Sequence, residues 1–124
     1  MPQRILVVDD EPDIVKVLVA RLKEHGYETI TASDGNQALV QAEQYQPDLI
    51  ILDIMMPGMD GTEAAQKLRE NPKTQDIPII FLSALQTKKE EQKEGERIGG
   101  NVILAKPFET DILLAKIREM ISGS

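Results

Sequence analysis

Residues 49–61 read LIILDIMMPGMDG, and this stretch indicates a buried strand, an acidic residue and the start of a helix. Residues 49–52 are four consecutive apolar residues with no polar alternation, as in strands that a parallel sheet buries on both faces. Asp60-Gly61 then opens a helical pattern. The stretch therefore predicts one strand–helix unit of a parallel sheet.

Four more units of this kind surround it. The other apolar runs are Ile5-Leu6-Val7-Val8, Thr29-Ile30-Thr31, Ile79-Ile80-Phe81-Leu82 and Val102-Ile103-Leu104. The predicted helices start at Pro12, Asp34 and Asp60, span residues 86–98, and start again near Thr110. This alternation predicts the α/β class: a single domain over residues 1–124, with five βα units forming a doubly wound, parallel, five-stranded sheet. The helix at 86–98 is dense in charge and poor in apolar residues, so we expect it to dock weakly.

The composition excludes several classes of function. The chain has 14 Lys and Arg against 21 Asp and Glu, a net charge of −7, which argues against direct binding to nucleic acid or to anionic membranes. It has no cysteine, so disulfides and thiolate metal sites are excluded. Its single histidine, His25, cannot build a multi-histidine site. The first apolar run is too short for a signal peptide or a membrane span, and we expect a cytoplasmic location.

Polar side chains follow the ends of four predicted strands. They are Asp9-Asp10 after the first strand, Asp53 after the third, Ser83 after the fourth and Lys106 after the fifth. Ligands of doubly wound sheets bind at this carboxyl edge. Taken singly, these residues have ordinary explanations as helix caps, turns or surface groups. Their coincidence at four strand ends favours one shared site.

The carboxylates predict a cation. Two like charges about 4 Å apart cost about 4 kcal/mol at an effective dielectric near 20, so Asp9, Asp10 and Asp53 need a cation or a bound proton to converge. Oxygen-only ligands favour a hard ion, and we expect Mg²⁺, with Mn²⁺ as a substitute. Lys106 and Ser83 suit the oxygens of a phosphoryl group, which leaves Asp53 as the nucleophile of a phosphoryl transfer.

The motifs that carry this site resemble the signature of response-regulator receiver domains of two-component systems. They are Val7-Val8-Asp9-Asp10-Glu11-Pro12, Leu52-Asp53-Ile54-Met55-Met56-Pro57-Gly58-Met59-Asp60-Gly61, Ser83-Ala84 and Lys106-Pro107-Phe108, in the family's order and spacing. The resemblance covers nearly the whole chain. It implies a flavodoxin-like (βα)₅ fold with strand order 2-1-3-4-5.

The resemblance also implies a role for each site residue. Asp53 would be the phosphoacceptor. Asp10 and Asp53 would bind Mg²⁺ directly, Asp9 through water, and Met55 through its backbone carbonyl. Ser83 and Lys106 would bind the phosphoryl group, and a cis peptide would precede Pro107.

As a receiver, the chain would be a signalling switch, not an enzyme with a separate substrate. It would catalyse only its own phosphorylation and a slow dephosphorylation. The donor would be a phosphohistidine on a sensor histidine kinase or a His phosphotransfer protein. Phosphorylation would change the face formed by the fourth helix, fifth strand and fifth helix. The same face is a possible site of homodimer formation. The downstream effector or output domain is not indicated.

Two positions depart from the family or modify its behaviour. Ile103 occupies the switch position on the fifth strand where the family usually has an aromatic residue that moves on phosphorylation, so this chain departs from the family at that residue. Met55 and Leu85 flank the site where polar side chains can orient an attacking water. Because apolar side chains cannot do this, we predict slow self-dephosphorylation.

Three other functions fit the sequence less well. An aspartate-nucleophile phosphatase would need a second Asp at position 55, which is Met. A flavodoxin-like cofactor binder would need a hydroxyl- and glycine-rich loop where Asp10-Glu11-Pro12 stands. A receiver that binds partners without phosphorylation would not need the acidic, hydroxyl and lysine positions, which are all present.

Overall fold

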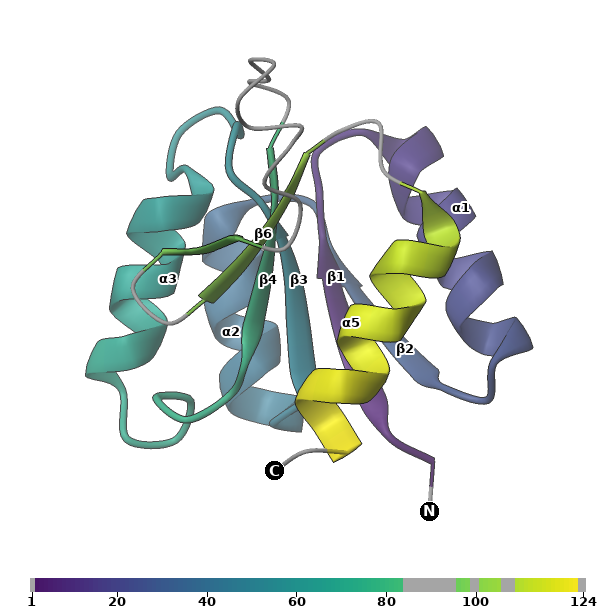
Figure 1. The fold of residues 1–124 in the computed structure, drawn as a ribbon. Coiled ribbons are helices and arrows are strands. Elements are labelled where there is room, and N and C mark those ends of the chain that lie inside the picture. Colours follow the sequence, from purple (N-terminus) through teal and green to yellow (C-terminus); the bar gives the residue numbers. More distant parts are fainter. Residues whose placement is uncertain (1, 84–95, 99–100, 106–108, 123–124) are drawn as a thin grey trace.

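The computed structural model describes residues 2–83, 96–98, 101–105 and 109–122. Figure 1 shows a central sheet with helices on both faces, and two clusters of buried side chains fill the two interfaces. The strands are β1 (Arg4–Val8), β2 (Glu28–Ala32), β3 (Leu49–Asp53), β4 (Ile79–Ser83), β5 (Glu96–Ile98) and β6 (Asn101–Ala105). The helices are α1 (Pro12–Glu24), α2 (Gly35–Tyr45), α3 (Gly61–Glu70) and α5 (Thr110–Ser122).

The strand order is β2-β1-β3-β4-β6-β5. Each pairing among β1, β2, β3, β4 and β6 is parallel, as predicted, and β5 pairs with β6 in the antiparallel direction. The prediction of five strands alternating with five helices is not confirmed. Residues 96–98, predicted as the end of a helix, form strand β5, and the rest of that predicted helix lies outside the described residues.

Successive strand residues point to opposite faces of the sheet, so each apolar run supplies two cores. One core lies under α1 and α5 and includes Ile5, Val7 and Ile51. The other lies under α2 and α3 and includes Leu6, Val8 and Ile50. All six of these side chains are fully buried. Burying an aliphatic side chain contributes about 1.5–3 kcal/mol, which explains why β1 and β3 need no polar alternation.

The helices begin where the sequence supplies a suitable residue. Pro12 occupies the first turn of α1, where its missing N–H costs nothing. Asp34 accepts a hydrogen bond from the backbone N–H of Gln37 at 2.8 Å and caps α2. Asp60 does the same for α3, through the N–H of Glu63 at 2.9 Å.

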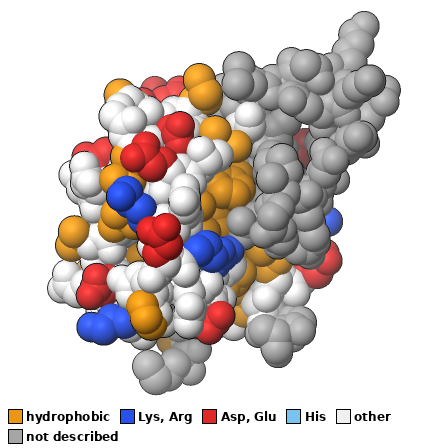
Figure 2. Space-filling view, turned by 90° about the vertical axis from the view of Figure 1, so that its left-hand side faces the viewer, with side chains coloured by type: hydrophobic (Ala, Val, Ile, Leu, Met, Phe, Trp, Pro, Cys, Tyr) orange, Lys and Arg blue, Asp and Glu red, His pale blue; other side chains and the backbone are white. Residues whose placement is uncertain are grey.

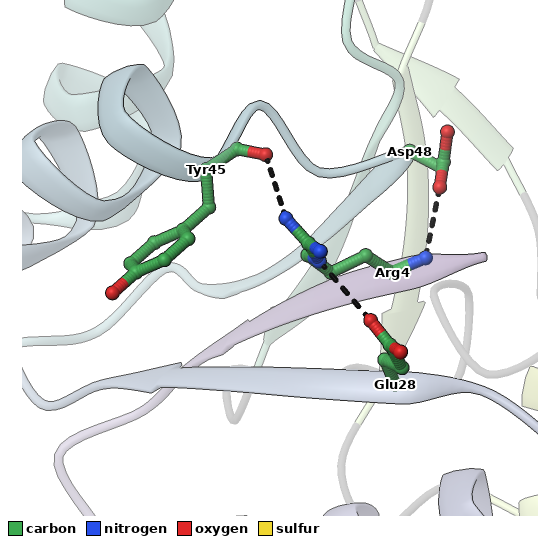
Figure 3. A network of polar contacts seen from close by, with 4 residues as sticks. All are labelled: Arg4, Glu28, Tyr45 and Asp48. Atoms are coloured by element: carbon green, nitrogen blue, oxygen red, sulfur yellow. Dashed lines mark hydrogen bonds and ion pairs between the residues drawn. The ribbon is translucent and has the colours of Figure 1, made fainter. Parts of the chain in front are cut away.

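A polar network closes the amino edge of the sheet, away from the predicted site (Figure 3). The backbone N–H of Arg4 donates to Asp48 at 2.8 Å, and its guanidinium contacts Glu28 at 3.4 Å. The same guanidinium donates to the carbonyl of Tyr45 at 3.3 Å. Arg4 thereby joins the starts of β1 and β2 to the end of α2. The ion pair itself is solvent-exposed, so we attribute little stability to it.

Figure 2 shows one face of the molecule, on which acidic and basic side chains are interspersed with apolar ones over the visible described part. The net charge of −7 is therefore not expressed there as a single acidic patch. Among the described residues, none of the helices has the length and apolar character that crossing a membrane requires.

Candidate metal and phosphoryl site

Four acidic residues converge at the carboxyl edge of the sheet. One carboxylate oxygen from each of Asp9, Asp10, Glu11 and Asp53 lies within 4.8 Å of the others. The register explains this convergence, because Val8 at the end of β1 pairs with Leu52 of β3. The residues that follow these two are Asp9 and Asp53. The structure therefore brings together the three aspartates that the sequence singled out.

Glu11 also belongs to the cluster, although the sequence pattern did not indicate it as a ligand. It precedes Pro12 at the start of α1 and has an extended backbone, with φ of −95° and ψ of 108°. Its side chain makes no capping hydrogen bond to the helix, and one of its carboxylate oxygens lies with those of the three aspartates. Its position directly after Asp10, before the first helical turn, was the available signal.

The cluster has a buried half and an exposed half. Asp9 and Asp53 are each 1% exposed, whereas Asp10 and Glu11 face solvent. The two buried carboxylates are held by local backbone groups. Oδ1 of Asp9 accepts the N–H of Glu11 at 2.9 Å, and Oδ1 of Asp53 accepts the N–H of Met55 at 3.3 Å. Two of the four carboxylates are thus held inside the protein while the other two line an open side.

The charge of this cluster requires compensation. At a separation of 4.8 Å, two carboxylates repel each other by about 3.5 kcal/mol at an effective dielectric near 20. A divalent cation between them would reverse the sign of this energy. All the donors are carboxylate oxygens, which suit a hard cation. The chemistry of the donor set therefore fits a metal ion.

Of the other predicted site residues, some lie within the described part of the chain and some lie outside it. Ser83 ends β4 one residue beyond Leu82, which pairs with Asp53, so its backbone lies at the same edge of the sheet. Lys106 and Pro107 lie outside the described residues, directly after the end of β6. The backbone of Ile103 pairs with Phe81 of β4. The side chain of Met55 is 50% exposed, next to Asp53.

A tight loop connects Asp53 to α3. The N–H of Ile54 donates to the carbonyl of Leu82 at 2.9 Å and extends the β3–β4 pairing past Asp53. The carbonyl of Ile54 then accepts the N–H of Gly61 at 2.9 Å, which closes the loop. At its end, hydrogen bonds from the N–H of Glu63 and the hydroxyl of Thr62 lower the pKa of Asp60 below its ordinary value of 3.8.

A groove of 380 Å³ opens beside Asp9 and Asp10. It runs between the starts of α1 and α2, where Lys16 and Gln37 contribute polar side chains. The acidic cluster is consequently accessible from one side to a solute.

Comparison with known proteins gives a consistent result. The family model for the response regulator receiver domain matches residues 5–118. Response regulator PleD of Caulobacter vibrioides is 41% identical over 120 residues, which cover 97% of this chain and 26% of PleD. The chain spans a quarter to a half of the length of the curated relatives it matches.

Solved structures agree with the fold. Chemotaxis protein CheY4 of Vibrio cholerae matches with a TM-score of 0.83 and 32% identity, over 97% of this chain and 99% of that chain. The receiver domain of a sensor histidine kinase from Pseudomonas aeruginosa, with a magnesium ion coordinated in its active site cleft, matches with a TM-score of 0.82 and 35% identity. That match covers 100% of both chains. The flavodoxin-like α/β sheet predicted from the sequence is confirmed, and the chain belongs to the response regulator receiver domain family.

Proposed function

We propose that residues 1–124 form a phosphoacceptor domain in which Asp53 receives a phosphoryl group from a partner phosphohistidine. The observation that carries the proposal is the cluster of four carboxylates that includes Asp53; one oxygen from each lies within 4.8 Å of the others. Asp53 is buried at the end of a central strand and still belongs to a cluster with an exposed half. A nucleophile in this position is held in place and remains reachable.

Mg²⁺ is the proposed cofactor, and Mn²⁺ would replace it. Asp9, Asp10 and Asp53 would hold the ion, together with the backbone carbonyl of Met55. When bound, the ion neutralises the carboxylates and the oxygens of the incoming phosphoryl group. A magnesium ion in the active site cleft of the related Pseudomonas receiver domain supports this choice.

The chemistry is a substitution at phosphorus. An oxygen of Asp53 forms a bond to phosphorus while the bond from phosphorus to the donor imidazole nitrogen breaks. The electron pair of the broken bond goes to that nitrogen, which takes up a proton as the histidine is regenerated. Ser83 and Lys106 would donate hydrogen bonds to the oxygens of the phosphoryl group. The backbone N–H of Met55 keeps Oδ1 of Asp53 oriented at 3.3 Å.

The product would act as a switch and not as the intermediate of an enzyme with a separate substrate. An added phosphoryl group changes the local charge by about −1.5 to −2 and biases a two-state equilibrium. We expect the response around β6 and α5, with residues 86–95 and Ile103 contributing, and this face could also mediate a homodimer. The donor would be a sensor histidine kinase or a His phosphotransfer protein. Such donors derive their phosphoryl group from ATP, so we expect the transfer in the cytoplasm.

The family assignment does not support the phosphatase and flavin-binding alternatives. A receiver that only binds partners remains the competing function. Direct phosphorylation separates it from the proposed function.

The test is incubation with acetyl phosphate and Mg²⁺ followed by intact-mass measurement. We expect a gain of one phosphoryl group, lost when EDTA replaces Mg²⁺ and absent in Asp53→Ala. Asp76→Ala is the matched control, because Asp76 is exposed in the connection before β4, and this variant should still be phosphorylated. No mass gain in the wild-type chain, or an undiminished gain in Asp53→Ala, would overturn the proposal.

A further inference from the structure

The loop of residues 54–60 between Asp53 and α3 is packed against backbone at its far end. Gly61, the first residue of α3, is buried against the backbone of Asp53 and Ile54. A Cβ at position 61 would lie 2.7 Å from Cα of Ile54 and would also overlap the carbonyl oxygen of Asp53. Because the obstruction is backbone, only glycine fits there. The start of α3 is therefore fixed directly against the residue proposed as the phosphoacceptor.

A second glycine holds the same loop from a different helix. Gly35 is the first residue of α2 and is buried. A Cβ at position 35 would lie 2.9 Å from each of Cβ, Cγ and Sδ of Met59, which is in the loop. Met59 thus packs directly against Gly35, in the space that a side chain at position 35 would occupy. Since its Cβ is fixed by the backbone, rotation of the side chain alone cannot make room.

The start of α2 is itself held firmly. The side chain of Asp34 caps the helix through the N–H of Gln37 at 2.8 Å. The side-chain oxygen of Gln37 in turn accepts the N–H of Ser33 at 3.0 Å. An added methyl group at position 35 would therefore be accommodated by movement of the loop more readily than by movement of the helix.

We infer that Gly35 and Met59 are positioning residues for the Asp53 site. Neither belongs to the acidic cluster. Their contact fixes the loop that carries Met55, whose N–H donates to Oδ1 of Asp53 at 3.3 Å. The same residue carries the carbonyl proposed as a metal ligand. A displacement of a few tenths of an ångström in this loop would thus act on the metal site. The inference rests on the proposed function.

The decisive variant is Gly35→Ala. Mg²⁺ affinity is measured by calorimetric titration, and the phosphorylation rate with acetyl phosphate by intact mass, both at a temperature where circular dichroism shows a folded chain. We expect Mg²⁺ affinity and phosphorylation rate to fall by about tenfold, because small misplacements of reacting groups have effects of this size or larger. Adding Met59→Ala deletes Cγ and Sδ and should restore part of the loss.

Gly26→Ala is the matched control. Gly26 has φ of +86°, and a Cβ there would meet nothing within 4 Å. This substitution should lower stability through backbone strain and leave Mg²⁺ affinity unchanged. The comparison separates an effect on positioning from general destabilisation.

Each outcome is informative. If the wild-type chain neither binds Mg²⁺ nor is phosphorylated, the proposed function fails. If the wild-type chain does both and folded Gly35→Ala matches it, the positioning role alone is overturned. If Gly35→Ala does not fold, Met59→Ala alone replaces it, and Mg²⁺ affinity equal to that of the wild type would then overturn the role.

Discussion

At the scale of a single residue, Met55 lies beside Asp53, the proposed phosphoacceptor. Its N–H donates to Asp53, and its side chain is 50% exposed beside the site. A thioether cannot orient a water molecule as an amide or a carboxylate can. We therefore predict that the phosphorylated chain outlasts a time scale of seconds, and that Met55→Asn shortens its half-life several-fold. The measurement is the loss of the added mass after acetyl phosphate is removed.

Val40→Asn provides the control for this experiment, because Val40 is 63% exposed on α2. It should leave the half-life unchanged. A wild-type half-life of seconds or less would contradict the prediction, as would equal half-lives for the wild type and Met55→Asn.

The three aspartates of the acidic cluster were predictable because strand ends are visible in the sequence. Asp9 and Asp53 each follow an unbroken apolar run, and parallel strands in register bring such positions together. Glu11 was missed because a glutamate before a proline reads first as a helix start. The roles of Ser83 and Lys106 stay predictions, since they depend on side-chain positions around the phosphoryl group.

At the scale of a secondary-structure element, Asp60 caps the start of α3, where the loop after Asp53 ends. Hydrogen bonds from Glu63 N–H and the hydroxyl of Thr62 lower its pKa below the ordinary value of 3.8. A carboxyl whose folded-state pKa is lowered stabilises the fold above its unfolded pKa and loses that contribution as pH falls through the folded value. This contribution is therefore complete above about pH 4 and is lost at lower pH.

Asp60→Asn isolates that contribution, because asparagine keeps the cap without titrating. We expect the unfolding free energy of the wild type to fall more steeply than that of Asp60→Asn below pH 4, as measured by urea denaturation. Asp60→Ala should lose about 1 kcal/mol at neutral pH, since it removes the cap itself. Parallel pH profiles for the wild type and Asp60→Asn would refute the assignment.

Strand β5 shows where element prediction failed. Residues 86–98 are rich in Lys, Glu and Arg, which favours a helix by local propensity. The structure instead pairs Glu96–Ile98 with β6 in the antiparallel direction. Two glycines separate these strands in the sequence, a spacing typical of a hairpin, and the open edge of β6 supplies the hydrogen-bonding partner. The pairing is a tertiary interaction that charge density along one segment does not indicate.

The contact between Gly35 and Met59 was beyond prediction for a related reason. The sequence indicates that each residue adjoins a helix start, but it does not give the distance between those starts. That distance follows from the packing of α2 and α3 on the same core. Residues of this kind can be identified only after the helices are placed on the sheet.

At the scale of the whole molecule, folding brings the like charges of the acidic cluster together, which opposes stability. The folded chain gathers four carboxylates, whereas the unfolded chain separates them. A cation that binds only the folded state stabilises it by about 2.7 kcal/mol at 100 times its dissociation constant. We therefore predict that Mg²⁺ raises the thermal unfolding midpoint, that EDTA reverses the rise, and that Na⁺ at equal ionic strength gives a smaller effect.

Asp10→Asn tests whether the acidic cluster is the origin of that rise. Asp10 is exposed, so the substitution removes one charge without disturbing the core. Without Mg²⁺ the variant should be more stable than the wild type, because one repulsive partner is gone, and its midpoint should respond less to Mg²⁺. Asp13→Asn, in the first turn of α1 and also exposed, should respond to Mg²⁺ as the wild type does. Because the two variants change the net charge equally, an equal Mg²⁺ response in Asp10→Asn and Asp13→Asn would mean that the ion acts on the overall charge and not at this cluster.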